Sequence, residues 1–296
     1  MPSVFEEIKF KLRSGEILPK LIIINVIVFL VINLGLVFSD LLRIDSSFFN
    51  QLVTCLSVPA SLPVLLRQPW SIVTYEFTNQ DILHILFNML WLYWMGKIFV
   101  EYLGAKKLLS VYILGGICGA LMYILFFNLF PLFTGSVNAS YALGASGSVL
   151  AITLAVATLL PDYTIFLLLI GPVKMKWIAA FTILLDLLSI SGSNAGGHIA
   201  HLGGALFGFF YIRQLKNGND IGKWLENLLF FISNLFSRKA KMRVAYSKSS
   251  KTKSQNKKPE PDQETIDLIL DKISKSGYTS LTSEEKELLF KASKKT

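Results

Sequence analysis

The sequence has few charged residues and few cysteines. Charged residues make up 17% of its 296 positions, against about 25% in an average soluble domain, whereas hydrophobic residues make up 52%. So small a share of charge excludes a single soluble core of ordinary composition. Of the two cysteines, Cys55 is expected in a loop and Cys118 in the middle of a helix, which argues against a disulfide framework. The composition indicates a polytopic membrane protein.

Six apolar runs have close to the length of about 20 residues with which a helix spans a bilayer. Each run is uncharged or nearly so, as expected of membrane helices. We therefore predict an all-α membrane protein with a six-transmembrane-helix bundle. The first run follows a charged leader that lacks a small-residue cleavage site, so we expect a retained anchor. The runs are residues 21–39, 83–100, 108–130, 141–160, 173–190 and 198–215.

Positive charge is distributed unevenly along the chain. Lysines and arginines flank alternate ends of the apolar runs, which predicts that both termini are cytoplasmic. The formal net charge is +9, and nine lysines or arginines without any acid lie between Arg238 and Pro259. Such a segment beside a membrane helix is typical of contact with anionic lipids. Nucleic acid is the weaker alternative, because aromatic residues are nearly absent from the segment, and we expect no nucleic-acid partner.

With this topology, the second, fourth and sixth runs all enter the membrane from the outer side. Polar groups inside a membrane are costly and normally face a bundle interior or a wet cavity. If the fourth helix enters the bilayer near Tyr141, Ser146 lies about 7–8 Å below the outer boundary, where a cavity could supply water. The outer ends of the three runs carry all three histidines of the chain, as part of the set His84, Asn88, Ser146, His198 and His201.

A serine with a nearby imidazole is the simplest nucleophile that this set offers. The serine hydroxyl is weak until a base takes its proton, and imidazole is the usual base near neutral pH. Ser146 with His198 is the obvious pair, although spacing alone leaves open whether His198 or His201 faces the serine. The segment 144–147, Gly-Ala-Ser-Gly, is by itself a weak signal, because small residues also serve close helix packing.

His84 and Asn88 lie four residues apart and therefore share one face of a helix. Two hydrogen-bond donors directed at one oxygen describe an oxyanion hole. The alternative for each residue is an ordinary hydrogen bond between helices. On the sixth run, Gly204 and Gly208 have a close-packing spacing that would bring this helix against the serine helix.

Three histidines also raise the possibility of zinc. The sequence contains no His-Glu-x-x-His pattern, and we expect no acid near the helix entrances that carry these histidines, so we predict no metal and no other cofactor. Asp186 is the only acid well within the fifth run. We expect it to be a solvated carboxylate near the membrane interface, and we assign it no catalytic role.

Three segments together resemble the rhomboid intramembrane serine proteases. They are residues 84–88 (His-Ile-Leu-Phe-Asn), residues 144–147 and residues 197–204 (Gly-His-Ile-Ala-His-Leu-Gly-Gly), in matching order and spacing. The resemblance covers about residues 21–215. It implies a serine endopeptidase of the six-span rhomboid fold in which a Ser–His dyad works without a catalytic aspartate.

Transferred to this sequence, the resemblance implies that Ser146 is the nucleophile and His198 the general base and acid. His84 and Asn88 would stabilise the oxyanion, together with the Ser146 N–H group. Leu150 stands where the family often has an aromatic residue. Substrates would be the transmembrane segments of single-span proteins, cleaved near the outer face, and membrane lipids would be further partners. We expect the inner membrane of a bacterium as the location.

Two other kinds of function compete with this interpretation. The first is a non-catalytic rhomboid-like protein that binds client helices in the membrane. The second is a small transporter, which the lack of a clear repeat or of a charge-lined helix break disfavours. Cleavage of a transmembrane reporter separates the protease from the client-binding protein.

The remaining segments fall outside the six-span core at residues 21–215. Residues 1–20 are expected in the cytoplasm, residues 216–237 as an interfacial amphipathic helix and residues 238–263 as a basic linker. Residues 264–296 predict a helical hairpin, in which Thr282 and Glu285 form a capping box. Such tails also occur in bacterial rhomboid-like proteins. The hairpin is too small for a core of its own, and we leave open whether it binds an unknown protein partner or is a passive, solvated tail.

Overall fold

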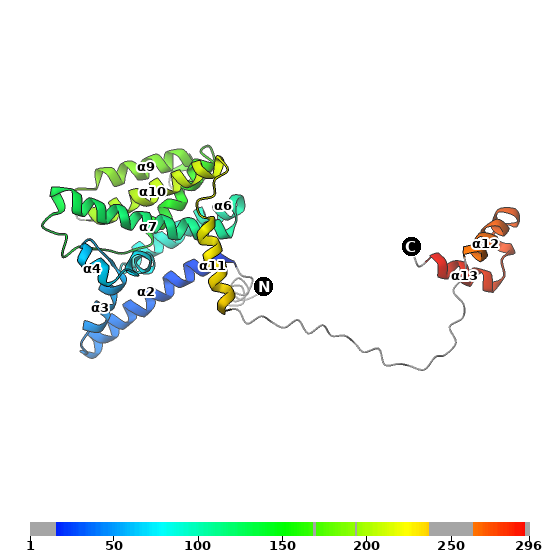
Figure 1. Cartoon of the computed structure of the whole chain (residues 1–296), viewed down its shortest axis with the longest axis horizontal. Coiled ribbons are helices and arrows are strands. Elements are labelled where there is room, and N and C mark those ends of the chain that lie inside the picture. The colour runs from blue at the N-terminus through cyan, green and yellow to red at the C-terminus, as the bar shows by residue number, and fades with distance from the viewer. Residues whose placement is uncertain (1–15, 168–169, 193, 237–262, 294–296) are drawn as a thin grey trace. The chain divides into compact units, whose positions relative to one another are not determined.

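The structure is a computed structural model that describes residues 16–167, 170–192, 194–236 and 263–293. The chain divides into two compact units, Met1–Arg238 and Lys239–Thr296. Most of the predicted cytoplasmic segment at residues 1–20 and nearly all of the basic linker at residues 238–263 lie outside the described residues. Figure 1 shows the helices of the first unit and the hairpin of the second.

Each of the six predicted spans coincides with a helix of the first unit. The bounds of the second, third, fifth and sixth helices agree with the prediction to within three residues, and the fourth and fifth helices are shorter than predicted. The helices are α2 (Ile17–Leu42), α6 (Ile82–Leu103), α7 (Ala105–Leu129), α8 (Ser146–Leu159), α9 (Met175–Leu188) and α10 (Ala195–Lys216).

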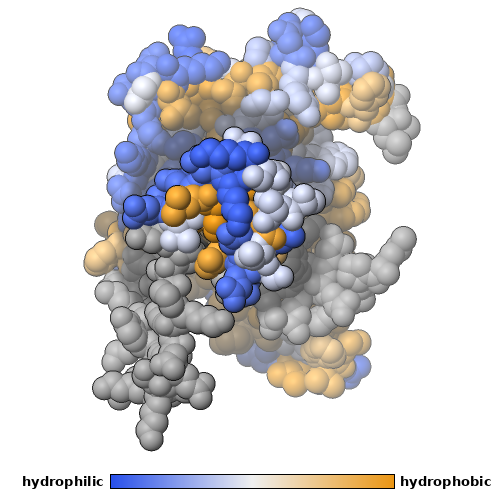
Figure 2. Space-filling view, turned by 90° about the vertical axis from the view of Figure 1, so that its right-hand side faces the viewer, coloured by the Kyte–Doolittle hydropathy of each residue, from blue (hydrophilic) through white to orange (hydrophobic). Residues whose placement is uncertain are grey.

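Three of these helices, α2, α6 and α7, are long and apolar enough to cross a membrane among the residues that the structure describes. Helix α8 is apolar but has 14 residues, which is about 21 Å of helix and less than a hydrocarbon core of about 30 Å. Large hydrophobic side chains lie exposed on α2, α6, α7 and α9, and Figure 2 shows such residues at the surface. The predicted all-α membrane fold is confirmed.

The fourth helix begins five residues later than predicted. Tyr141 and Ala142 form a short strand, β2, which pairs with β1 (Val58–Pro59). Gly144 follows with a φ of 126°, a conformation that ends any helix and that side chains rarely adopt. The helix can start only after this turn, at Ser146. The predicted start of this helix near Tyr141 was therefore wrong.

Helix α8 is the central helix of the first unit. Every residue from Gly147 to Ala157 is buried, and the helix packs against α6, α7, α9 and α10. A Cβ on Gly204 would lie closer to the carbonyl oxygen of Gly147 than any real contact, and a Cβ on Gly208 would meet the carbonyl oxygen of Ala151 in the same way. The predicted close packing of the sixth helix on the serine helix is confirmed.

The segment between α2 and α6 folds into short helices that the sequence did not reveal. It contains α3 (Ser47–Leu56), α4 (Leu62–Arg67), α5 (Ser71–Thr74) and the 3-10 helix η1 (Tyr75–Phe77). Glu76 in η1 is fully buried, and its Oε2 accepts a hydrogen bond of 3.0 Å from the hydroxyl of Ser148. This bond connects η1 to the first turn of α8, two residues after Ser146.

A β-hairpin precedes α9. Strands β3 (Thr164–Leu167) and β4 (Gly171–Lys174) pair antiparallel, which the sequence also did not reveal. Asp162 accepts hydrogen bonds from the ammonium groups of Lys176 at 2.8 Å and Lys174 at 3.1 Å. These two lysines lower the pKa of the exposed Asp162 carboxyl.

The predicted amphipathic helix is present as α11 (Lys223–Phe236). Its hydrophobic side chains Trp224, Leu228 and Phe231 are exposed. Lys107 of α7 forms ion pairs with Asp220 and Glu226 and so connects the start of α11 to the bundle. An exposed apolar face beside a membrane helix is what an interfacial helix requires.

The second unit is the helical hairpin that the sequence predicts. It consists of α12 (Gln263–Ser276), the 3-10 helix η3 (Tyr278–Ser280) and α13 (Ser283–Ser293). The Thr282 N–H donates to Glu285 Oε2 at 2.7 Å, and the Glu285 N–H donates to Thr282 Oγ1 at 3.3 Å, so the capping box is confirmed. The hydrogen bond from Lys272 has the largest effect on Glu285 and lowers the pKa of its carboxyl, and the hydrogen bond from the Thr282 N–H lowers this pKa further.

Candidate functional site

Ser146 is the first residue of α8, directly after the turn at Gly144. The N–H groups of the first turn of a helix have no partner within the helix, and the helix dipole favours negative charge at this end. A substrate oxygen that gains negative charge beside Ser146 would therefore meet unpaired donors. Glycine at 144 suits this place, because a Cβ there would lie 3.2 Å from Cε1 of His84 and 3.7 Å from Oγ of Ser146.

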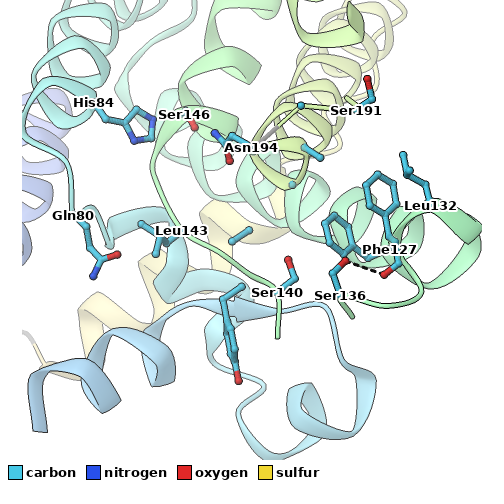
Figure 3. Close-up of a pocket in the computed structure, with 17 residues that line it drawn as sticks. Gln80, His84, Phe127, Leu132, Ser136, Ser140, Leu143, Ser146, Ser191 and Asn194 are labelled. Carbon is cyan, nitrogen blue, oxygen red and sulfur yellow. Dashed lines mark hydrogen bonds between the residues drawn. The ribbon is translucent and has the colours of Figure 1, made fainter. Parts of the chain in front are cut away.

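His84 lies in the first turn of α6, where Asp81 caps the helix by accepting a 2.6 Å hydrogen bond from the His84 N–H. Figure 3 shows the His84 ring pointing toward Ser146. Asn88 follows one turn further along α6 and is buried, and its side-chain Nδ2 has no hydrogen-bond partner among the residues that the structure describes. A buried amide without a partner is uncommon and leaves a donor free for a ligand.

A cavity of about 610 Å³ opens beside this serine. Ser146 and His84 both line it, together with Asn194, whose side chain lies near Ser146 in Figure 3. The other walls come from the segment at residues 132–143 and the start of α10. His198, His201 and Asn88 are not among its lining residues, although Gly196 and Gly197 are. The predicted nucleophile and one predicted oxyanion donor thus share one polar cavity.

Asp186 lies against the two histidines of α10. Its Oδ1 is 2.8 Å from Nδ1 of His198 and 2.9 Å from Nδ1 of His201. The carboxylate is buried, with 8% of its side chain exposed. The prediction of a solvated carboxylate was therefore wrong. The expectation that no acid stands near the histidines was wrong too, because α9 and α10 pack together and bring residues 12 and 15 positions apart into contact.

Within the described part of the chain, the same three side chains form a group that could hold a metal ion. One ligand atom from each of Asp186, His198 and His201 lies within 4.8 Å of the others. Around a tetrahedral zinc with bonds of about 2.1 Å, however, neighbouring ligand atoms are about 3.3 Å or more apart. The observed N–O separations of 2.8 and 2.9 Å are those of direct hydrogen bonds.

The packing of α10 on α8 distinguishes the two histidines. Gly204 faces the backbone of α8 at Gly147, next to Ser146. At 3.6 residues per turn, His201 is rotated from Gly204 by about 60°, whereas His198 is rotated by about 120°. Along the axis of α10, His201 lies about 4.5 Å from Gly204, whereas His198 lies about 9 Å from it. In the described residues, no hydrogen bond joins the Ser146 hydroxyl to either imidazole, a contact that often forms only with substrate.

Comparison with known families places this site in a known fold. Residues 66–217, just over half of the chain, match the Rhomboid domain. The chain belongs to the rhomboid family. The matched range includes Ser146, all three histidines and Asp186, and it ends at the last turn of α10. The hairpin unit of this rhomboid matches a family of unknown function over residues 253–295.

Several curated rhomboid-like proteins are similar to the chain. "Presenilin-associated rhomboid-like protein A, mitochondrial" of Danio rerio is 32% identical over 144 residues, which cover 47% of this chain and 36% of that protein. "RHOMBOID-like protein 12, mitochondrial" of Arabidopsis thaliana is 31% identical over 158 residues, or 50% and 47% of the two chains. The chain thus spans between about a third and a half of the length of these relatives.

Proposed function

We propose that this rhomboid is an intramembrane serine endopeptidase in which Ser146 is the nucleophile. The observation that carries the proposal is the shared cavity, where Ser146 stands at a helix N-terminus opposite His84. Its hydroxyl oxygen attacks the scissile carbonyl, and an imidazole of α10 accepts the hydroxyl proton and passes it to the leaving amine. Water from the cavity then hydrolyses the acyl-enzyme and regenerates the serine.

In the proposed reaction, hydrogen-bond donors on α6 and α8 stabilise the oxyanion. His84 and Asn88 lie on one face of α6, and the first N–H groups of α8 point toward the same region. The unpartnered Asn88 Nδ2 supports this role, because such a donor gains a partner when the oxyanion forms. No metal or other cofactor takes part in the proposed reaction.

The resemblance implied His198 as the general base, whereas the packing of α10 favours His201. His201 is closer to the α8 side of α10 in both rotation and height. We therefore propose His201 as the general base and His198 as its neighbour on the shared carboxylate of Asp186.

Separate substitution of the two histidines tests this choice. We expect His201→Ala to lower the cleavage rate of a single-span reporter in liposomes by about 10⁴-fold or more, as removal of a catalytic base does. His198→Ala should cause a much smaller loss. If only His198→Ala abolishes cleavage, the base is His198, as the sequence predicts, and the packing argument fails.

The competing function is a non-catalytic protein that binds client helices. The purified full chain in liposomes separates the two, because a protease converts a labelled single-span reporter into two fragments. The fragments are identified by mass spectrometry. Capture of the reporter without fragments at any enzyme concentration would favour the client-binding function.

The positions of lysines and arginines along the chain support an orientation of the protein in the membrane. We propose that both termini are cytoplasmic, that the cavity opens to the outer side and that the substrates are transmembrane segments cleaved near that side. The inner membrane of a bacterium remains our proposed location, although the similar curated proteins carry mitochondrial names. For the basic linker, we propose contact with anionic lipids, because nine lysines or arginines without any acid lie between Arg238 and Pro259.

A further inference from the structure

Asp186 is the one acidic residue of α9. Its side chain is buried, whereas the side chains of its neighbours in the helix are exposed. Leu184, Leu185, Leu187 and Leu188 are all about half exposed or more, whereas Asp186 is 6% exposed. Helix α9 therefore presents leucines outward and the carboxylate toward α10. An ionisable group inside a membrane helix is costly unless it is paired, and here it is paired with two imidazoles.

The hydrogen bonds to Asp186 determine which ring nitrogen carries the proton. A carboxylate only accepts hydrogen bonds, so Nδ1 of both His198 and His201 must be protonated to donate to it. A neutral imidazole with its proton on Nδ1 has a free lone pair on Nε2, which is the atom that a general base needs. When Nε2 accepts the serine proton, the carboxylate stabilises the imidazolium that forms.

Both imidazoles share a single oxygen of Asp186, yet they differ in orientation. The ring centroids are 5.8 Å apart and the rings are nearly perpendicular, at 83°. Their Nε2 atoms therefore point in different directions, and only one of them can face the serine at a time. The shared carboxylate holds the other ring against α9 through a second hydrogen bond to the same Oδ1.

We propose that Asp186 is a positioning residue that fixes the tautomer and orientation of the α10 imidazoles, so that this rhomboid operates with a Ser–His–Asp arrangement. The inference rests on the proposed function, and it departs from the dyad without aspartate that the resemblance implied. Asp186 acts through the imidazole and touches neither substrate nor reacting atoms.

Substitution of Asp186 tests the proposal through kinetics. In liposomes, Asp186→Asn should lower kcat for reporter cleavage by between about 10²- and 10⁴-fold and leave KM nearly unchanged, because an amide cannot stabilise the imidazolium. Asp186→Glu, which restores the charge, should recover part of kcat. Asp162→Asn, which removes an exposed carboxylate in the loop before β3, is the control and should leave both constants unchanged. A wild-type kcat in Asp186→Asn would overturn the proposal, and so would a change in KM alone.

The tautomer provides a readout that does not depend on activity. The chain has only three histidines, so ¹⁵N-histidine NMR of the full protein in bilayers can be assigned with single substitutions. We expect Nδ1-protonated rings at His198 and His201 in the wild type and loss of this preference in Asp186→Asn. An unchanged tautomer would overturn the proposal even if the reporter is never cleaved, in which case the proposed function has failed separately. Loss of wild-type cleavage on adding a chelator would instead identify these residues as a metal site and overturn the proposal.

Discussion

Replacing Ser146 by alanine is expected to abolish cleavage of a single-span reporter, with the rate falling by about 10⁴-fold or more. The alanine removes the hydroxyl oxygen that forms the acyl-enzyme and leaves the cavity and helix α8 in place, because Ser146 is the first residue of that helix. The measurement is the initial rate of fragment formation in liposomes. Binding of the reporter should be retained, since the substitution removes one hydroxyl from the cavity wall and leaves its other lining residues in place.

The matched control is Ser191→Ala. Ser191 lines the same cavity as Ser146 but lies in the exposed segment before α10. It should retain cleavage close to that of the wild type. Equal cleavage by wild type and Ser146→Ala would eliminate Ser146 as the nucleophile, whatever the effect at Ser191.

The second large effect is expected on stability, from Gly204→Ala. The added Cβ would overlap the backbone carbonyl of Gly147, and backbone cannot move aside as a flexible side chain can. The two helices must separate, at a cost of about 3 kcal/mol, which is the upper end for overpacking of a core. Because Gly147 follows Ser146, cleavage should also fall. Thermal unfolding in detergent measures the stability, and the reporter assay measures the activity.

Gly135→Ala is the control for this substitution. A Cβ at Gly135 meets nothing within 4 Å, and its φ is not positive, so the change in stability should stay within about 0.5 kcal/mol. An unfolding temperature of Gly204→Ala equal to that of the wild type would show that α8 and α10 do not pack at the distance described.

The hydrophobic runs predicted the membrane helices, because the thickness of the bilayer sets the length of a spanning helix. An apolar run of that length can be recognised directly in the sequence. The Gly204 and Gly208 spacing likewise revealed the contact with α8, since four residues return to the same face of a helix. The start of α8 was missed because it depends on pairing between Val58–Pro59 and Tyr141–Ala142, which are more than 80 residues apart. A local hydrophobic pattern carries no information about such a pairing.

The contacts of Asp186 with the two histidines of α10 were not predicted from the sequence. A lone acid in an apolar helix is by default a candidate functional residue, and this signal was present in the sequence. Its partners, however, depend on the rotation of α9 against α10, which sequence spacing does not determine. For the same reason, spacing left the choice between His198 and His201 open. The bond between Glu76 and Ser148 was not indicated by the sequence either, since Glu76 lies in a short segment outside the predicted spans.

The central claim, that Ser146 is an activated nucleophile, is tested most directly by covalent labelling. A fluorophosphonate reacts when the serine oxygen displaces fluoride from phosphorus, and mass spectrometry of the digested full-length protein locates the adduct. We expect an adduct on Ser146, strongly reduced in His201→Ala, with Ser191 in the same cavity unlabelled. Labelling of another serine in a protein that cleaves the reporter, with Ser146 unmodified, would contradict the claim.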